Sequence, residues 1–216
     1  MGKIYITRHG ETKWNIVRRI QGQLNSPLTI LGIKQAKWLA ERLINSKIDI
    51  IYSSSLPRAM ETANIIKGNR QIKVIPRDDL REINLGDWQG QLITDVEKNN
   101  PKQHTNFWKK PEHYIPDSGE GFEDLSKRVG SFFDEILDKH PNDNVLIVAH
   151  AIIIKALLNY INHGGEIKRF WEGPNVKPTS LTKFRFENGK LKNDLLADTS
   201  HYKETNTVGW FMDEDD

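Results

Sequence analysis

The chain has 216 residues, of which 37% are hydrophobic and 28% are charged, a composition typical of soluble globular proteins and not of disordered, fibrous or membrane-spanning ones. The 31 lysines and arginines nearly balance the 29 aspartates and glutamates, so the net charge of +2 does not favour nucleic-acid binding. The absence of cysteine excludes disulfide bonds, thiolate metal sites and cysteine nucleophiles. We expect one compact domain over residues 1–211, because domains commonly hold about 100–200 residues.

The first residues are typical of a buried strand and not of a targeting segment. Residues 3–6 are mainly apolar, but Thr7, Arg8 and His9 follow at once and leave no apolar core for a signal peptide. No run approaches the roughly 18 apolar residues that a membrane span needs. These features predict a cytoplasmic protein that does not bind membranes.

Continuous apolar runs predict strands over residues 3–7, 48–52 and 144–149, buried on both faces of a parallel sheet. Apolar residues at helical spacing between Ile33 and Ile44, and between Phe122 and Leu137, predict amphipathic helices. Strands that alternate with helices indicate right-handed βαβ units. The fold class is therefore α/β: a three-layer α/β/α sandwich whose mostly parallel central sheet is flanked by helices.

Single residues predict where several helices begin and where the chain turns. Thr29 and Ser118 are placed as helix N-caps, and Pro57 as the first residue of a helix over residues 59–66. Alternation over residues 180–186, a turn at Asn188-Gly189 and a second run over 191–196 predict a C-terminal β-hairpin.

Two segments lack a periodic pattern. Residues 100–118, rich in Pro, Lys and aromatic side chains, are expected to form a lid-like excursion. Its aromatic residues could line a leaving-group pocket or anchor the excursion to the sheet. The acidic tail over residues 212–216 is expected to be disordered.

The residues that follow the predicted strands carry the chemistry. In open α/β sheets ligands bind beyond the carboxyl ends of the strands. Arg8 and His9 follow the first strand, Arg58 lies in the first turn of the helix after the second, and His150 follows the third. Free N–H groups of helix N-termini point to the same edge, so the expected ligand is a phosphate.

These residue types suit phosphoryl chemistry. The planar guanidinium of arginine matches phosphate oxygens, and two arginines with a protonated histidine could neutralise a dianion. A neutral imidazole is also a competent nucleophile. One histidine at a strand end is more often a capping or hydrogen-bonding residue, but two histidines and two arginines at one edge favour a functional site.

The motif Arg8-His9-Gly10-Glu11-Thr12, followed by Trp14-Asn15, resembles that of the histidine phosphatase superfamily, which has the phosphoglycerate-mutase-like fold. Four further stretches resemble later blocks of that family in order, and with the first they cover most of residues 3–158. They are Leu28–Ala36, Ser53–Ala63, Leu80–Gly90 with Gly119-Glu120, and His150. Residues 160–216 match only loosely.

The resemblance implies a role for each matching residue. His9 would be the nucleophile that forms a phosphohistidine, and Glu82 the acid that protonates the leaving oxygen and later activates water. Phosphate oxygens would be held by charged and polar side chains, namely Arg8, Arg58, His150, Asn15 and Gln21. The family needs no metal and no cofactor, because the guanidiniums supply the positive charge.

Other residues compete for these roles or depart from the pattern. Glu11 and Glu120 could also act as the acid, but Glu11 is expected to orient its neighbours and Glu120 to begin a helix. The family usually has glycine after the second histidine, where this chain has Ala151; the methyl group is harmless only if the φ of that residue is negative. The remaining histidines show no metal-binding spacing and are expected to be structural: His104, His113, His140, His163 and His201.

The resemblance implies a metal-independent phosphatase that hydrolyses monoesters of small metabolites, with a small phosphorylated substrate or inorganic phosphate as partner, acting as a monomer or homodimer. The stretch Ile83–Gly90 is similar to the phosphatase branch, which includes α-ribazole and broad-specificity phosphatases. Two alternatives stay open: a phosphoglycerate mutase-type phosphoryl transfer, and a non-catalytic phospholigand-binding protein.

Overall fold

The computed structural model describes residues 2–187 and 190–204 and shows one six-stranded sheet in the order β3-β2-β4-β1-β5-β6. The strands are β1 (Lys3–Arg8), β2 (Ile50–Ser54), β3 (Lys73–Arg77), β4 (Val145–Ala149), β5 (Leu181–Glu187) and β6 (Lys190–Asp198). The first four are mutually parallel, and β5 is antiparallel to both β1 and β6. The mostly parallel sheet and the C-terminal hairpin are confirmed; the predicted turn at 188–189 and the tail 212–216 lie outside the described residues.

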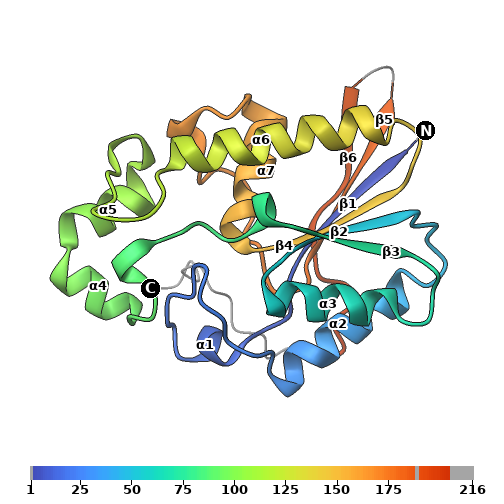
Figure 1. Cartoon of the computed structure of the whole chain (residues 1–216), viewed down its shortest axis with the longest axis horizontal. Helices are drawn as coiled ribbons and strands as arrows, with labels where there is room; N and C mark the ends of the chain where they lie inside the picture. The colour runs from blue at the N-terminus through green and yellow to red at the C-terminus, as the bar shows by residue number, and fades with distance from the viewer. Residues whose placement is uncertain (1, 188–189, 205–216) are drawn as a thin grey trace.

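Helices cover both faces of this sheet (Figure 1). They are α1 (Lys13–Ile16), α2 (Ile30–Arg42), α3 (Pro57–Lys67), α4 (Ile93–Asn99), α5 (Pro101–Lys109), α6 (Phe122–Lys139) and α7 (Ala151–His163). Short 3₁₀ turns add η1 (Asp78–Leu80), η2 (Gly86–Trp88), η3 (Pro111–His113) and η4 (Ile167–Arg169). No helix in the described part of the chain is long and apolar enough to cross a bilayer.

The alternation of side chains along the central strands creates two hydrophobic cores. Ile147 of β4 packs with α6 and α7, whereas Leu146 and Val148 pack with α2 and α3. Successive residues of a strand point to opposite faces, so a strand covered on both sides must be apolar throughout. That requirement explains the continuous apolar runs and confirms the three layers.

Of the predicted helix starts, those at Thr29 and Pro57 are confirmed and the one at Ser118 is wrong. Thr29 caps α2 by accepting a hydrogen bond from the Gly32 N–H at 2.8 Å, and Pro57 is the first residue of α3. The N-cap predicted at Ser118 is wrong, because α6 begins after Gly121 and the Ser118 hydroxyl accepts instead from the Asp87 N–H at 3.0 Å.

The structure also contains elements that the sequence pattern did not indicate. β3 was not predicted: it is a short edge strand, half-buried and interrupted by Pro76, so it lacks the apolar run of a central strand. Residues 100–118 contain helix α5 and the turn η3, and α4 and α5 lie beyond one end of the sheet (Figure 1).

Candidate active site

The candidate site lies where β1, β2 and β4 end. β1 and β4 pair in parallel with Arg8 opposite Ala149, so His9 and His150 leave the sheet side by side. Their ring centroids are 5.1 Å apart. Six of the seven predicted residues line one pocket, together with Gly22: Arg8, His9, Asn15, Gln21, Arg58 and Glu82. His150 adjoins this pocket through its contact with His9.

His9 is 3% exposed and held in one orientation. Its Nδ1 lies 2.7 Å from the carbonyl oxygen of Gly10. A carbonyl can only accept, so Nδ1 carries the proton and Nε2 keeps its lone pair. Burial, reinforced by the positive charges of Arg58 and Arg8, lowers the pKa of His9 well below its usual value. The ring is therefore neutral at pH 7, the form in which an imidazole is nucleophilic.

His150 is fully buried beside it and precedes the first turn of α7. Its Nε2 lies 2.7 Å from the hydroxyl of Ser54, and its buried Nδ1 has no hydrogen-bond partner. Burial lowers the pKa of His150 well below its usual value, with Arg58 adding to the shift. The ring is therefore neutral at pH 7, whereas the sequence allowed for a protonated histidine that would help to neutralise a dianion.

Arg8 and Arg58 are each 1% exposed and are oriented by backbone carbonyls. Arg8 donates to the carbonyl of Val176 at 2.8 Å, whereas Arg58 donates to the carbonyls of Gly22 and Leu24, both at 2.7 Å. Burial lowers the pKa of both guanidiniums to about 10, so both stay charged at pH 7. The Nε donors of both side chains are buried and unpaired. An anion in the pocket could satisfy them.

Glu82 is 6% exposed and closes another side of the pocket. Its two carboxyl oxygens accept from the backbone N–H groups of Ile83 at 3.0 Å and Ile152 at 3.4 Å. Burial raises the pKa of Glu82, although these N–H groups and the two arginines oppose the rise. A carboxyl with a raised pKa holds a proton closer to neutral pH, as a general acid must.

Asn15 and Gln21 line the same pocket and leave polar atoms without partners. The side-chain oxygen of Asn15 accepts from the Thr12 N–H at 2.9 Å in a capping box, while its buried Nδ2 is unpaired. The buried Oε1 of Gln21 is also unpaired. Buried polar groups are normally satisfied, so these atoms indicate a polar ligand.

The two competing carboxylates do not line this pocket. Glu11 accepts from the hydroxyl of Thr29 at 2.8 Å and so orients a neighbour, as expected. Glu120 forms an ion pair with Arg128 at 2.5 Å and lies before the first residue of α6. Among residues 2–187 and 190–204, no group of three or more His, Asp or Glu side chains could hold a metal ion.

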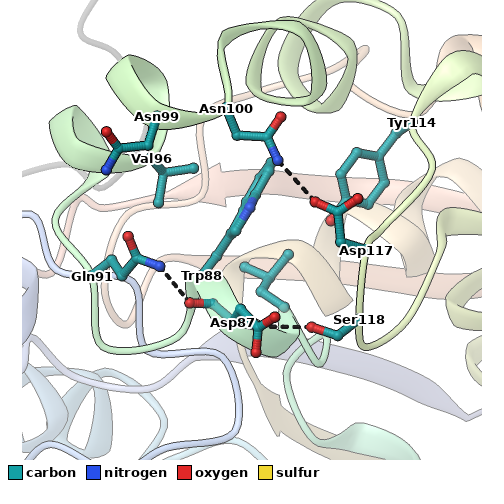
Figure 2. A pocket seen from close by; sticks show the side chains of 10 residues that line it. Asp87, Trp88, Gln91, Val96, Asn99, Asn100, Tyr114, Asp117 and Ser118 are labelled. Atoms are coloured by element: carbon teal, nitrogen blue, oxygen red, sulfur yellow. Dashed lines mark hydrogen bonds between the residues drawn. The ribbon is translucent and has the colours of Figure 1, made fainter.

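The aromatic residues of the 100–118 segment also lie away from this pocket. Phe107 is 1% exposed within the core, and Trp108 packs against Trp171 at a centroid distance of 4.9 Å. Tyr114 lines a separate pocket of about 210 Å³ with Trp88, shown in Figure 2. Phe107 lies in the core and Trp108 packs against that core, as the anchoring alternative expects.

Two supporting residues were missed by sequence reasoning. Ser54, the last residue of β2, hydrogen-bonds His150. Thr62 joins two segments of the candidate site, because its hydroxyl accepts from the Gly10 N–H at 3.1 Å and donates to the Arg58 carbonyl at 2.8 Å. Ser54 ends β2, Thr62 lies within α3, and both belong to the stretch Ser53–Ala63 that resembles the family, but their partners are distant in the chain and no local pattern shows them.

The departure at Ala151 is compatible with the site. Among the residues that the structure describes, only Arg18, Thr179 and Ala197 combine a side chain with a positive φ. Ala151 is the first residue of α7 and is 1% exposed. The φ of Ala151 is therefore not positive, so its methyl group is harmless there.

Comparison with known proteins agrees with this geometry. The family model described as "Histidine phosphatase superfamily (branch 1)" matches residues 4–199. The chain is 35% identical to phosphoglycerate mutase-like protein 4 of Arabidopsis thaliana, over 94% of this chain and 88% of that protein. It is 34% identical to phosphoserine phosphatase 1 of Hydrogenobacter thermophilus, over 79% of this chain and 81% of that protein.

Solved structures show the same similarity. The fold matches that of Bacillus stearothermophilus YhfR with a TM-score of 0.87 and 36% identity, over 93% of this chain and 99% of that one. It also matches a mutant phosphoserine phosphatase from Entamoeba histolytica in complex with phosphoserine, with a TM-score of 0.81 and 27% identity, over 93% of this chain and 99% of that one.

Proposed function

The chain belongs to the histidine phosphatase superfamily, and from that premise we propose that it hydrolyses phosphate monoesters of small metabolites through a phosphohistidine intermediate. Relatives named as phosphatases support phosphatase activity. The observation that carries the finer proposal is the pocket itself. There the neutral ring of His9 lies among two charged guanidiniums and the buried carboxyl of Glu82.

In the first step, the lone pair on Nε2 of His9 attacks the phosphorus of the bound ester. An N–P bond forms as the P–O bond to the leaving group breaks, and the leaving oxygen takes the proton of Glu82. Arg8 and Arg58 stabilise the negative charge that spreads over the phosphoryl oxygens. Their positions, fixed by backbone carbonyls, need no rearrangement as that charge develops.

In the second step, water attacks the same phosphorus and the N–P bond breaks. Glu82, now ionised, accepts a proton from the water, so inorganic phosphate leaves and both side chains return to their starting state. The unpaired Nδ1 of His150 and Nδ2 of Asn15 are available to the phosphoryl oxygens. Asn15 Nδ2 would donate as it stands, whereas His150 Nδ1 would donate when that ring nitrogen carries a proton.

Small phosphorylated amino acids and hydroxy acids are the first substrates to test, because structures of a relative from Entamoeba histolytica hold phosphoserine and 3-phosphoglyceric acid. The alternative is a mutase-type transfer, in which the phosphoryl group passes to a second substrate and water must be excluded between the two transfers. One relative carries a mutase-like name. The test must therefore separate hydrolysis from transfer.

The deciding experiment compares p-nitrophenyl phosphate and phosphoserine, each with EDTA, against 3-phosphoglycerate supplied with 2,3-bisphosphoglycerate. We expect release of inorganic phosphate from the first two, at a rate that EDTA does not change. Isomerisation of 3-phosphoglycerate without phosphate release would contradict hydrolysis and support a mutase. A chain that binds phosphate but turns over no substrate in a broad panel would support a non-catalytic ligand-binding role.

A further inference from the structure

Residues 21–24, here called the 21–24 loop, contribute Gln21 and Gly22 to the pocket wall. The loop is held by a side chain that does not line the pocket. Gln89 follows the turn η2, and its Oε1 accepts a hydrogen bond from the backbone N–H of Gln23 at 2.7 Å. Backbone pairing already fixes the base of the loop, since the Ile20 N–H donates to the Gln91 carbonyl at 2.9 Å. The Gln89 side chain adds a contact at the tip.

This loop is bonded directly to two groups of the active site. Arg58 donates to the carbonyls of Gly22 and Leu24, and the side-chain amide of Gln23 donates to the backbone carbonyl of Glu82 at 3.2 Å. The loop therefore sets where the Arg58 guanidinium points. It also carries Gln21, which lines the pocket and whose side-chain amide N–H groups are donors that suit phosphate oxygens.

The Gln89 side chain lies directly against Gly22 of the loop. Gly22 has a φ of +48°, and a Cβ added there would lie 2.2 Å from Gln89 Oε1. Glycine suits this left-handed backbone, and a Cβ at residue 22 would displace the Gln89 side chain. The amide of Gln89 thus lies against the loop backbone itself.

We propose that Gln89 is a positioning residue that fixes the 21–24 loop and, through it, the orientation of Arg58 and Gln21 toward phosphate. The inference rests on the proposed function, since it assigns Arg58 to the phosphoryl group. Without the Gln89 acceptor, the Gln23 N–H loses its partner and the loop tip is released. Arg58 would then keep its charge and lose its fixed direction.

The test compares Gln89→Leu with Gln91→Leu, a matched change two residues away. The Gln91 side chain donates its hydrogen bond to the Asp87 carbonyl, at 2.6 Å, and lines the separate pocket of Figure 2. Both variants keep the backbone pairing at residues 90 and 91. Inorganic phosphate is the probe, with calorimetry for its affinity and hydrogen exchange for the Gln23 amide.

For Gln89→Leu we expect about tenfold weaker phosphate binding, in line with the loss of one hydrogen bond to a partly buried donor, and faster exchange at Gln23. Gln91→Leu should change neither. Gln89→Glu keeps an acceptor oxygen, so it should restore the protection of Gln23. A thermal melt of each variant identifies losses that come only from unfolding.

Two results would overturn the inference: unchanged exchange at Gln23 in Gln89→Leu, or equal effects of the two leucine variants on phosphate affinity. A lower melting temperature with unchanged phosphate affinity of the folded protein would also overturn it, because the role would then be structural alone. If the unchanged protein binds phosphate but hydrolyses no ester, catalysis fails as a proposal while the binding and exchange comparison still decides the role of Gln89.

Discussion

The imidazole ring of His9 meets that of His150 at a centroid distance of 5.1 Å with the ring planes inclined by 59°, yet the two rings are held in different ways. His9 bonds its own neighbour, the Gly10 carbonyl, whereas His150 bonds Ser54 on another strand. This leaves Nε2 of His9 and Nδ1 of His150 without a protein partner. The two histidines are therefore expected to have different roles.

Replacing each histidine should separate those roles. We expect His9→Ala to form no acid-labile phosphoenzyme, because no lone pair remains in line with the phosphorus. His150→Ala should still form it, but more slowly, because it loses one contact to the phosphoryl group and keeps the nucleophile. Rapid quenching with ³²P-labelled substrate measures the intermediate. Labelled phosphoenzyme in His9→Ala would assign the nucleophile elsewhere.

Removing the proposed acid should affect poor leaving groups most. Glu82→Gln cannot supply a proton, so hydrolysis of phosphoserine should fall by about 10²–10⁴-fold, the usual contribution of general acid catalysis. Hydrolysis of p-nitrophenyl phosphate should fall much less at the first step, because nitrophenolate leaves without a proton. Burst kinetics with both substrates check this, and equal losses in the burst rate would show that Glu82 is not the acid.

Replacing Ala151 by glycine, which is usual at this position in the family, should not raise activity. Ala151 has no positive φ and its methyl group is buried, so Ala151→Gly should cost about 0.5–1 kcal/mol of stability. That corresponds to a fall in melting temperature of about 1–4 °C for a chain of this size. We expect kcat/KM to change less than twofold. A several-fold gain would mean that the methyl group obstructs the site.

The ion pair between Arg77 and Glu135 should make stability depend on acid pH. Arg77, at 2.7 Å, and Lys139 lower the pKa of Glu135 from 4.5 to about 2. A carboxylate with a lowered folded-state pKa stabilises the fold above its unfolded pKa, and this contribution is lost as pH falls from 4.5 toward 2.

Comparison with Glu135→Gln measures that contribution. Because Glu135 is partly exposed, screening by solvent reduces its effect to about 1 kcal/mol in the free energy of unfolding at pH 7. Denaturant unfolding of both proteins should show this difference at pH 7 and a shrinking difference below pH 4.5. A difference that does not vary between pH 7 and pH 3 would contradict the role of the ion pair.

Much of the fold followed from local pattern because central strands must be apolar on both faces. β1, β2 and β4 were predicted on that ground, and the periodic stripes located α2 and α6. β3 was not predicted, because an edge strand need not be apolar on both faces and Pro76 argues against a strand there. The N-cap predicted at Ser118 is wrong, because the Ser118 hydroxyl accepts from the distant Asp87 N–H and not from the helix that follows.

The sequence by itself determined which chemical groups stand after the strands: Arg8 and His9, Arg58, and His150. It could do so because the carboxyl ends of parallel strands meet at one edge, a property of the fold class and not of any single contact. Only the tertiary structure decided the protonation and direction of those groups. Burial lowers the pKa of both histidines and raises that of Glu82, while partners far away in the chain, such as Ser54, Val176 and Gln89, orient the site. Desolvation and hydrogen-bond geometry depend on what packs around a residue, which no local sequence pattern records.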